Sequence, residues 1–237
     1  MSEWKARRFW TTASTRAAEG GWEVRLDDRK LRTPGKQALV LPTEALAEAV
    51  AAEWRAQENE ILPHTMPLTR AANSAVEKVA PQRDDVVRML AEYGGTDLLC
   101  YRATEPEALI EQQAEGWDPL VDWAAVELRA PLRITHGVIP VEQDAAALQR
   151  LHAQVAALDL YGLTALHDLV TIPGSLVLGL AVIRGRITGG EAHQLSRIDE
   201  EFQMERWGED EEAREAAAGR LVAIEWAERL WQLSRTG

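Results

Sequence analysis

The first forty residues alternate between apolar and polar positions, a pattern typical of short strands. Trp22, Val24 and Leu26 alternate with polar residues, and the polar run after them predicts a turn before a second extended piece. Pro34-Gly35 predicts another turn, because proline presets φ and glycine tolerates positive φ. A short apolar strand, ALVLP, follows. We therefore expect a small β-rich unit at this end of the chain.

One long helix is predicted to close this unit. Thr43 fits the N-cap position, because a threonine side chain accepts a hydrogen bond from an otherwise unpaired backbone N–H. The residues that share one apolar face at helical spacing are Leu46, Ala49, Val50 and Trp54.

Helical spacing dominates the rest of the chain. We expect two short helices at residues 106–116 and 118–128, separated by Gly116 and Asp118-Pro119, and an extended segment at 131–141. Further helices are predicted at about 142–157, 162–171, 173–185, 190–207 and 210–234.

These elements predict an α+β fold with two domains. Residues 1–62 form a small β-rich domain with one long helix, and residues 63–237 form a larger, mainly helical domain. The boundary is placed at ILPHTMP, where two prolines separate the two patterns. No repeat of 20–50 residues is present, which argues against a solenoid.

Composition narrows the class of protein. The 237 residues carry a formal net charge of −12, which disfavours binding to nucleic acid phosphates. A single cysteine excludes an internal disulfide framework and fits a reducing compartment. Because no apolar run is long enough for a membrane helix and no secretory signal is evident, we expect a soluble intracellular protein.

The motifs of common enzymes are missing. The chain contains no phosphate-binding GxxxxGK[ST] loop, no dinucleotide-binding GxGxxG and no nucleophile elbow. The five histidines form no HxxxH or ExxH pair, the spacings that place metal ligands on one helical face. Cys100 lies in an apolar segment and is expected to be an inert, buried thiol. We therefore expect neither a cofactor nor enzyme activity.

An acidic stretch, IDEEFQMERWGEDEEA, spans residues 198–213. Gly208 is expected to end one helix, and Glu209 to Glu212 to begin the next, where carboxylates favour the positive end of the helix dipole. The remaining acids, Asp199 to Glu201, leave an alternative open, which is a carboxylate-dependent metal enzyme or hydrolase. Successive helical residues point about 100° apart, which argues against a shared ion.

Nine tryptophans are the most unusual feature of the composition. Four of them lie on apolar faces and are expected to be core residues: Trp22, Trp117, Trp123 and Trp226. Trp54 and Trp207 are surrounded by charged residues and are candidates for an interface, where tryptophan often anchors a partner.

Several blocks together resemble the Atp-twelve family, the assembly chaperones of the soluble catalytic head of the F-type ATP synthase. The matching blocks near the start are LRTPGK, LPTEALA, EWRAQ, MPLTR and the asparagine of AANSA. Later blocks, in the same order as in the family, are TDLLCYRA, WDPLVDW and LSRIDEEFQMERWGEDEEA. The resemblance covers most of residues 9 to 226. One departure is Asp27-Asp28, where the family commonly has Asp-Gly.

The resemblance implies a chaperone that binds the free alpha subunit of the ATP synthase and shields its apolar, beta-facing surface until beta displaces it. Members carry an important acidic residue before E-E-[FY]-Q, and the matching position here is Asp199. We therefore expect a partner surface made of Asp199, Glu200, Gln203 and Trp207. Trp54 is a second candidate, although it is equally able to join the β-rich unit to the helices.

One further alternative stays open beside the metal enzyme and the chaperone. A stable structural subunit would remain in the finished synthase, whereas a chaperone must leave. We expect a monomer without nucleic acid or membrane insertion. Its location is expected to be the bacterial cytoplasm, or the mitochondrial matrix if the source is eukaryotic.

Overall fold

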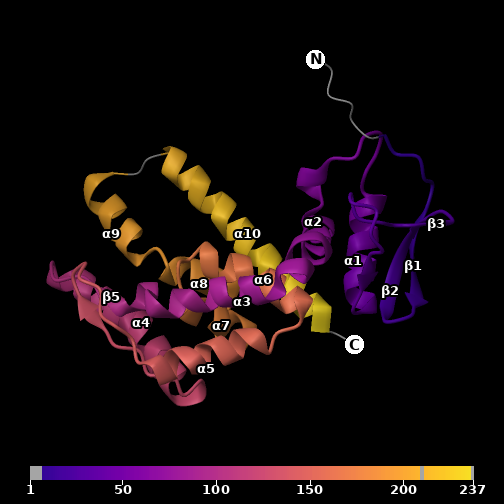
Figure 1. The fold of residues 1–237 in the computed structure, drawn as a ribbon. Helices are drawn as coiled ribbons and strands as arrows, with labels where there is room; N and C mark the ends of the chain where they lie inside the picture. The colour runs from indigo at the N-terminus through magenta and orange to yellow at the C-terminus, as the bar shows by residue number, and fades with distance from the viewer. Residues whose placement is uncertain (1–6, 209–210, 236–237) are drawn as a thin grey trace. The chain divides into compact units, whose positions relative to one another are not determined.

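The computed structural model describes residues 7–208 and 211–235. Short strands come first and helices make up most of the remainder, so the fold is α+β, as the sequence predicts (Figure 1). The chain divides into two compact units. The first contains residues as far as Arg83 together with 160–164 and the segment from 229 onward, and the second contains 84–159 and 165–228. The division into independently folding domains at residue 62 stays a prediction.

The first unit contains an antiparallel sheet in which β2 pairs with each of the other strands described. The strands are β1 (Ala13–Ala18), β2 (Gly21–Leu26), β3 (Arg29–Lys30) and β4 (Val40–Leu41). Val24 and Leu26 are buried, as their alternation with polar residues predicts.

Asp27 forms the turn between β2 and β3. Its φ of 52° lies in the left-handed region, which aspartate adopts more readily than most residues. Its carboxylate accepts hydrogen bonds from the backbone N–H groups of Thr11 at 3.0 Å and Thr12 at 2.8 Å. These bonds fix the turn at Asp27.

Helix α1 (Glu44–Arg55) packs on β1 and β2. Thr43 caps it as predicted, because its side chain accepts a hydrogen bond from the N–H of Leu46 at 3.1 Å. Leu46 and Val50 are completely buried, which confirms the predicted apolar face.

Glu53 on α1 caps the next helix, α2 (Pro67–Ser74). Its carboxylate accepts hydrogen bonds from the N–H groups of Leu68 at 2.7 Å and Thr69 at 2.8 Å, and from the Thr69 hydroxyl at 2.6 Å. A carboxylate is favourable at this position because the first N–H groups of a helix have no partner within the helix.

The remaining α-helices that the structure describes follow in chain order. They are α3 (Arg83–Glu92), α4 (Glu107–Glu127), α5 (Ala145–Ala156), α6 (Leu160–Thr171), α7 (Leu176–Ile183), α8 (Gly189–Leu195), α9 (Ile198–Trp207) and α10 (Glu211–Arg235). Between them, β5 (Tyr101–Arg102) pairs in parallel with β6 (Thr135–His136). The segment predicted to be extended over 131–141 therefore forms a strand only at these two residues.

Helix α4 corrects the prediction of two short helices. It runs unbroken through Gly116 and contains Pro119 in its interior. A continuous stripe of buried residues holds it together: Leu109, Gln113, Trp117, Leu120, Val121 and Ala124. A Cβ on Gly116 would meet the Ile198 side chain at 2.8 Å, so this glycine allows close approach of α9 rather than ending α4. Tertiary burial outweighs the local cost of glycine and proline here.

The predicted single helix at 190–207 is wrong in one respect, because α8 and α9 are separate. The break falls at Ser196 and Arg197. Two side chains accommodate it: the Trp117 indole donates to the carbonyl of Leu195 at 2.7 Å, and the Ser196 hydroxyl donates to that of His193 at 2.8 Å. The carbonyls at the end of α8 are thus paired without a continuing helix.

The core of the second unit surrounds α7, in which every residue is buried. Asp97 lies against the start of this helix and is itself fully buried. It accepts hydrogen bonds from the Ser175 hydroxyl at 2.7 Å, the N–H of Val177 at 2.9 Å and the N–H of Leu99 at 3.1 Å. Burial is the main cause that raises the pKa of Asp97 to about 6.

The four tryptophans predicted to be core residues differ in burial. Trp117 is fully buried, while Trp22 and Trp123 are half-buried. The prediction for Trp226 is wrong, because this residue is 41% exposed. On α10 the buried face is formed by Ile224 and Ala227 instead. Among the described residues, no helix is long and apolar enough to cross a membrane.

Candidate partner-binding site on helix α9

Helix α9 carries four of the five predicted partner-binding residues. It begins at Ile198 after the break described above and ends at Gly208, as predicted. Gly208 has a φ of 96°, and its N–H bonds to the carbonyl of Met204 at 2.9 Å. This positive φ favours glycine and turns the chain away from the helix.

Asp199 points toward α4. Its Oδ1 atom accepts a hydrogen bond from the Nε2 of Gln113 at 2.6 Å. Gln113 is only 1% exposed, and its Oε1 accepts a second bond from the N–H of Ala103 at 2.8 Å. The Asp199 carboxylate is therefore part of a polar chain that fixes the start of α9 on α4.

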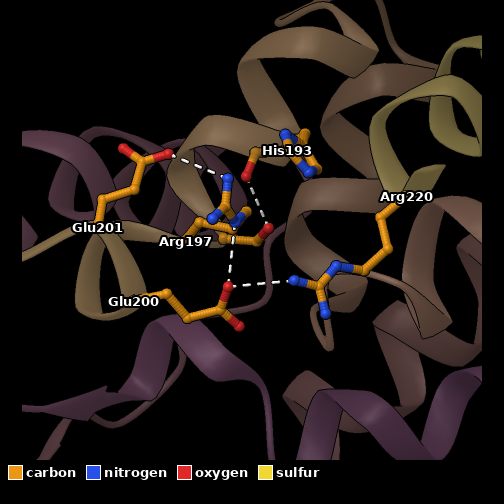
Figure 2. A network of polar contacts seen from close by, with 6 residues as sticks. His193, Arg197, Glu200, Glu201 and Arg220 are labelled. Carbon is orange, nitrogen blue, oxygen red and sulfur yellow. Dashed lines mark hydrogen bonds and ion pairs between the residues drawn. The ribbon is translucent and has the colours of Figure 1, made fainter. Parts of the chain in front are cut away.

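Glu200 and Glu201 have other partners than Asp199 and belong to an arginine network (Figure 2). Arg197 contacts Glu200 at 3.0 Å and Glu201 at 3.4 Å, and Arg220 on α10 contacts Glu200 at 3.2 Å. Arg197 is the most buried member, with 12% of its side chain exposed. The network joins α9 to α10, although pairs this exposed contribute only about 0.2–1 kcal/mol each.

The three carboxylates from Asp199 to Glu201 do not converge. Asp199 bonds to α4, while the other two bond to Arg197. In the part of the chain that the structure describes, no group of three or more histidine, cysteine, aspartate and glutamate side chains is arranged to hold a metal ion. This geometry gives no support to the alternative of a carboxylate-dependent metal enzyme.

Of the two remaining candidates on α9, Gln203 and Trp207, the structure describes the side chain of the first only. Gln203 is exposed. Trp207 forms the last residue of the helix, but its side chain lies outside the described part. Of the acids predicted to begin the next helix, Glu211 and Glu212 do lie in the first turn of α10, whereas residues 209 and 210 lie outside the described residues.

Trp54 belongs to the first compact unit, whereas α9 belongs to the second. It is half-buried and packs edge-on against Trp10, with ring centroids 5.0 Å apart. Its Nε1 atom is buried, and no hydrogen-bond partner is described for it. The contact with Trp10 supports the structure of the first unit, and the partner-binding role of Trp54 stays a prediction.

Two buried groups near the candidate site were not predicted. Gln113 supports Asp199, and the signal for it was a polar residue within the apolar stripe of α4. His193 lies at the end of α8 and is 6% exposed. Cys100, by contrast, is buried as predicted, and burial raises the pKa of its thiol to about 12, which keeps it protonated and unreactive near neutral pH.

Comparisons with known proteins identify the class. The sequence matches the family described as ATP12 chaperone protein over residues 7–125, which is half of the chain. The chain belongs to this family, and it is therefore a member of a class of chaperones.

Particular relatives extend the match along the chain. This chain is 25% identical to "Protein atp12, mitochondrial" of Schizosaccharomyces pombe, and the alignment covers 88% of this chain and 76% of the relative. The crystal structure of Atp12 from Paracoccus denitrificans superposes with a TM-score of 0.96 at 69% identity, covering 98% of this chain and all of that one. A putative chaperone from Agrobacterium tumefaciens gives a TM-score of 0.91 at 36% identity, covering 95% and 85% of the two chains.

Proposed function

We propose that this chain is an assembly chaperone of the F-type ATP synthase that binds the free alpha subunit. Its membership of the ATP12 chaperone family is the observation that carries the proposal. The sequence blocks that match the family occur in the same order along most of the chain, including the block that forms α9.

The physical task of such a chaperone is to cover an exposed surface. An unassembled alpha subunit exposes the apolar face that beta later covers, and contiguous apolar patches of this kind drive aggregation. Reversible coverage keeps the subunit soluble until beta displaces the chaperone. A cycle of binding and displacement needs no cofactor and no covalent chemistry.

We place the partner surface on α9. Glu200 and Gln203 are exposed and available for contact. Asp199 is half-buried and fixes the helix through Gln113, so its contribution is at least partly to orient the surface. Trp207 completes this set, and Trp54 remains the second candidate. We also propose a monomer that acts in the bacterial cytoplasm, or in the mitochondrial matrix if the source is eukaryotic.

Aggregation of the alpha subunit tests this proposal. Purified alpha subunit is diluted from denaturant, and light scattering is followed with and without this protein. We expect suppression at a near-stoichiometric ratio. An unrelated acidic protein of similar size and net charge serves as the control. Aggregation that proceeds equally in both samples overturns the proposal.

A further inference from the structure

One side of the sheet in the first unit carries more basic than acidic side chains. Successive side chains of a strand point to opposite sides of a sheet, so those that alternate with Val24 and Leu26 point away from the buried side. We call this second side the basic face. The strand register places together on it Ser14, Arg16, Glu23, Arg25, Lys30 and Val40.

Glu23 lies at the centre of the basic face and is surrounded by cations. It is 7% exposed, and its carboxylate oxygens lie 3.1 Å from Nε of Arg25 and 2.7 Å from Nζ of Lys30. Arg16 lies directly opposite Glu23 in the register. The hydrogen bond from Lys30 lowers the pKa of Glu23 most, and the charges of the three cations lower it further, so Glu23 is ionised at pH 7. Three cations therefore face one carboxylate, which leaves an excess of positive charge.

Two of these cations are accessible to a partner. Arg16 is exposed, and 59% of the Lys30 side chain is exposed. No ion pair of Arg16 is present among residues 7–208 and 211–235. The charge that Glu23 does not neutralise thus lies at the surface of the sheet.

The other acids of this part of the chain lie in the turns. Glu19 belongs to the turn between β1 and β2, and Asp27 and Asp28 belong to the turn between β2 and β3. The Asp27 carboxylate is already bonded to the N–H groups of Thr11 and Thr12. These turn acids do not cancel the excess, because residues 7–41 contain eight Lys and Arg against four Asp and Glu.

The rest of the chain has the opposite charge. Residues 42–237 contain seventeen Lys and Arg against thirty-three Asp and Glu. An acidic partner is therefore repelled by most of the chain and attracted to the basic face. Such an asymmetry orients a partner during encounter and raises the rate of association.

An acidic protein segment fits the basic face better than nucleic acid does. The side chains that the register places on this face include no aromatic ring on which a base could stack. The net charge of −12 also opposes binding to a phosphate backbone.

We propose that the basic face of the sheet binds an acidic segment of the unassembled subunit, whose carboxylates meet Arg16 and Lys30. This inference rests on the proposed function. It gives the first unit a part in recognition, in addition to the surface on α9 in the second unit.

Three variants change the charge of the basic face while Glu23 keeps its ion pairs with Arg25 and Lys30. Arg16→Gln removes one exposed cation. Ser14→Glu adds a carboxylate directly opposite Arg25, where a pair of opposite charges supports the sheet. Ser14→Lys adds a cation at the same exposed position.

Arg186→Gln is the matched control. Arg186 is exposed and belongs to the second unit, and its loss changes the net charge by the same amount as Arg16→Gln or Ser14→Glu. Circular dichroism confirms folding of each variant. Interferometry measures the association rate constant with freshly refolded alpha subunit between about 20 and 500 mM NaCl, a range over which salt screens exposed charges.

At the lowest salt concentration, Arg16→Gln and Ser14→Glu should each lower the association rate constant about threefold, and Ser14→Lys should raise it about twofold. The control should stay within about 1.5-fold of wild type, and all differences should vanish at the highest salt concentration.

Three results would overturn the basic face while the proposed function stands. The first is an equal loss in Arg186→Gln, because the net charge alone would then steer the subunit. The second is an unchanged rate in all three variants of the face. The third is binding to duplex DNA that Arg16→Gln abolishes while the rate with the subunit is unchanged, which would reassign the face to nucleic acid. Absence of binding between the wild-type protein and the alpha subunit overturns both proposals.

Discussion

The side-chain amide of Gln113 donates a hydrogen bond of 2.6 Å to Oδ1 of Asp199, and this bond joins α4 to the start of α9. Gln113 is held in place from the other side by the N–H of Ala103. The acidic residue to which the family resemblance assigns importance therefore has an internal partner. Its effect on a bound subunit would be transmitted through the position of α9.

Substitutions of Asp199 distinguish orientation from direct contact. Asp199→Ala removes the acceptor for Gln113, so it should weaken binding to the alpha subunit by about tenfold while the fold stays intact. Asp199→Asn retains an acceptor oxygen and should bind within about threefold of wild type. Interferometry measures both. Equal losses in the two variants would mean that the charge itself contacts the partner, and normal binding by Asp199→Ala would remove the residue from the site.

Trp54 should contribute to the stability of the first unit through its edge contact with Trp10. Because the ring is half-buried, Trp54→Ala should lower the free energy of unfolding by about 2 kcal/mol. Trp54→Phe keeps an aromatic contact and removes the unpaired Nε1, so its cost should stay below about 1 kcal/mol. Urea unfolding measures both values. If the folded Trp54→Phe variant binds the alpha subunit less tightly, Trp54 also belongs to the partner surface.

The role of Glu53 as the cap of α2 predicts a measurable loss of stability when the residue is replaced. Glu53→Ala should lower the free energy of unfolding by about 1–3 kcal/mol, because the N–H groups of Leu68 and Thr69 lose their partner. Glu58→Ala is the control, since Glu58 is exposed and should change the value by less than about 0.5 kcal/mol. Equal urea midpoints for the two variants would contradict the capping role.

Asp97 should make the free energy of unfolding decrease as pH rises, which is the reverse of the usual effect of an aspartate. Burial raises its pKa from 3.8 to about 6, so the folded state binds a proton more tightly than the unfolded state does. The contribution of Asp97 to the free energy of unfolding is therefore most favourable below about pH 4. This contribution, on the order of 2–3 kcal/mol, is lost as pH rises through 6.

The variant Asp97→Asn isolates this contribution. It cannot titrate, although it places an amide near the N–H of Val177 and should be less stable overall. Urea unfolding of both proteins between pH 4 and 7 should show wild type losing stability relative to Asp97→Asn as pH rises. Parallel profiles would mean that Asp97 does not titrate in this range.

The sequence predicted the elements whose signals are local. The alternation of Val24 and Leu26, the cap at Thr43 and the end of α9 at Gly208 each depend on neighbouring residues, and all three are confirmed. Local signals failed where tertiary contacts override them. Gly116 and Pro119 read as helix breaks, yet a continuous buried face keeps α4 whole.

The candidate site was only partly predictable for the same reason. The acidic stretch drew attention to α9, but Gln113 lies 86 positions from Asp199 and no spacing rule connects them. Glu53, Asp97 and His193 are likewise defined by the elements that pack on them. Composition identified tryptophan as unusual, but it could not separate buried Trp117 from exposed Trp226.

Displacement by beta tests the central claim most directly. Complexes of this protein with refolded alpha subunit are isolated on a sizing column with in-line light scattering, and purified beta subunit is then added. A chaperone should appear with alpha before the addition and elute free afterwards, while alpha moves to a complex with beta. If this protein never comigrates with alpha, or remains bound to the assembled alpha and beta subunits, the account is contradicted.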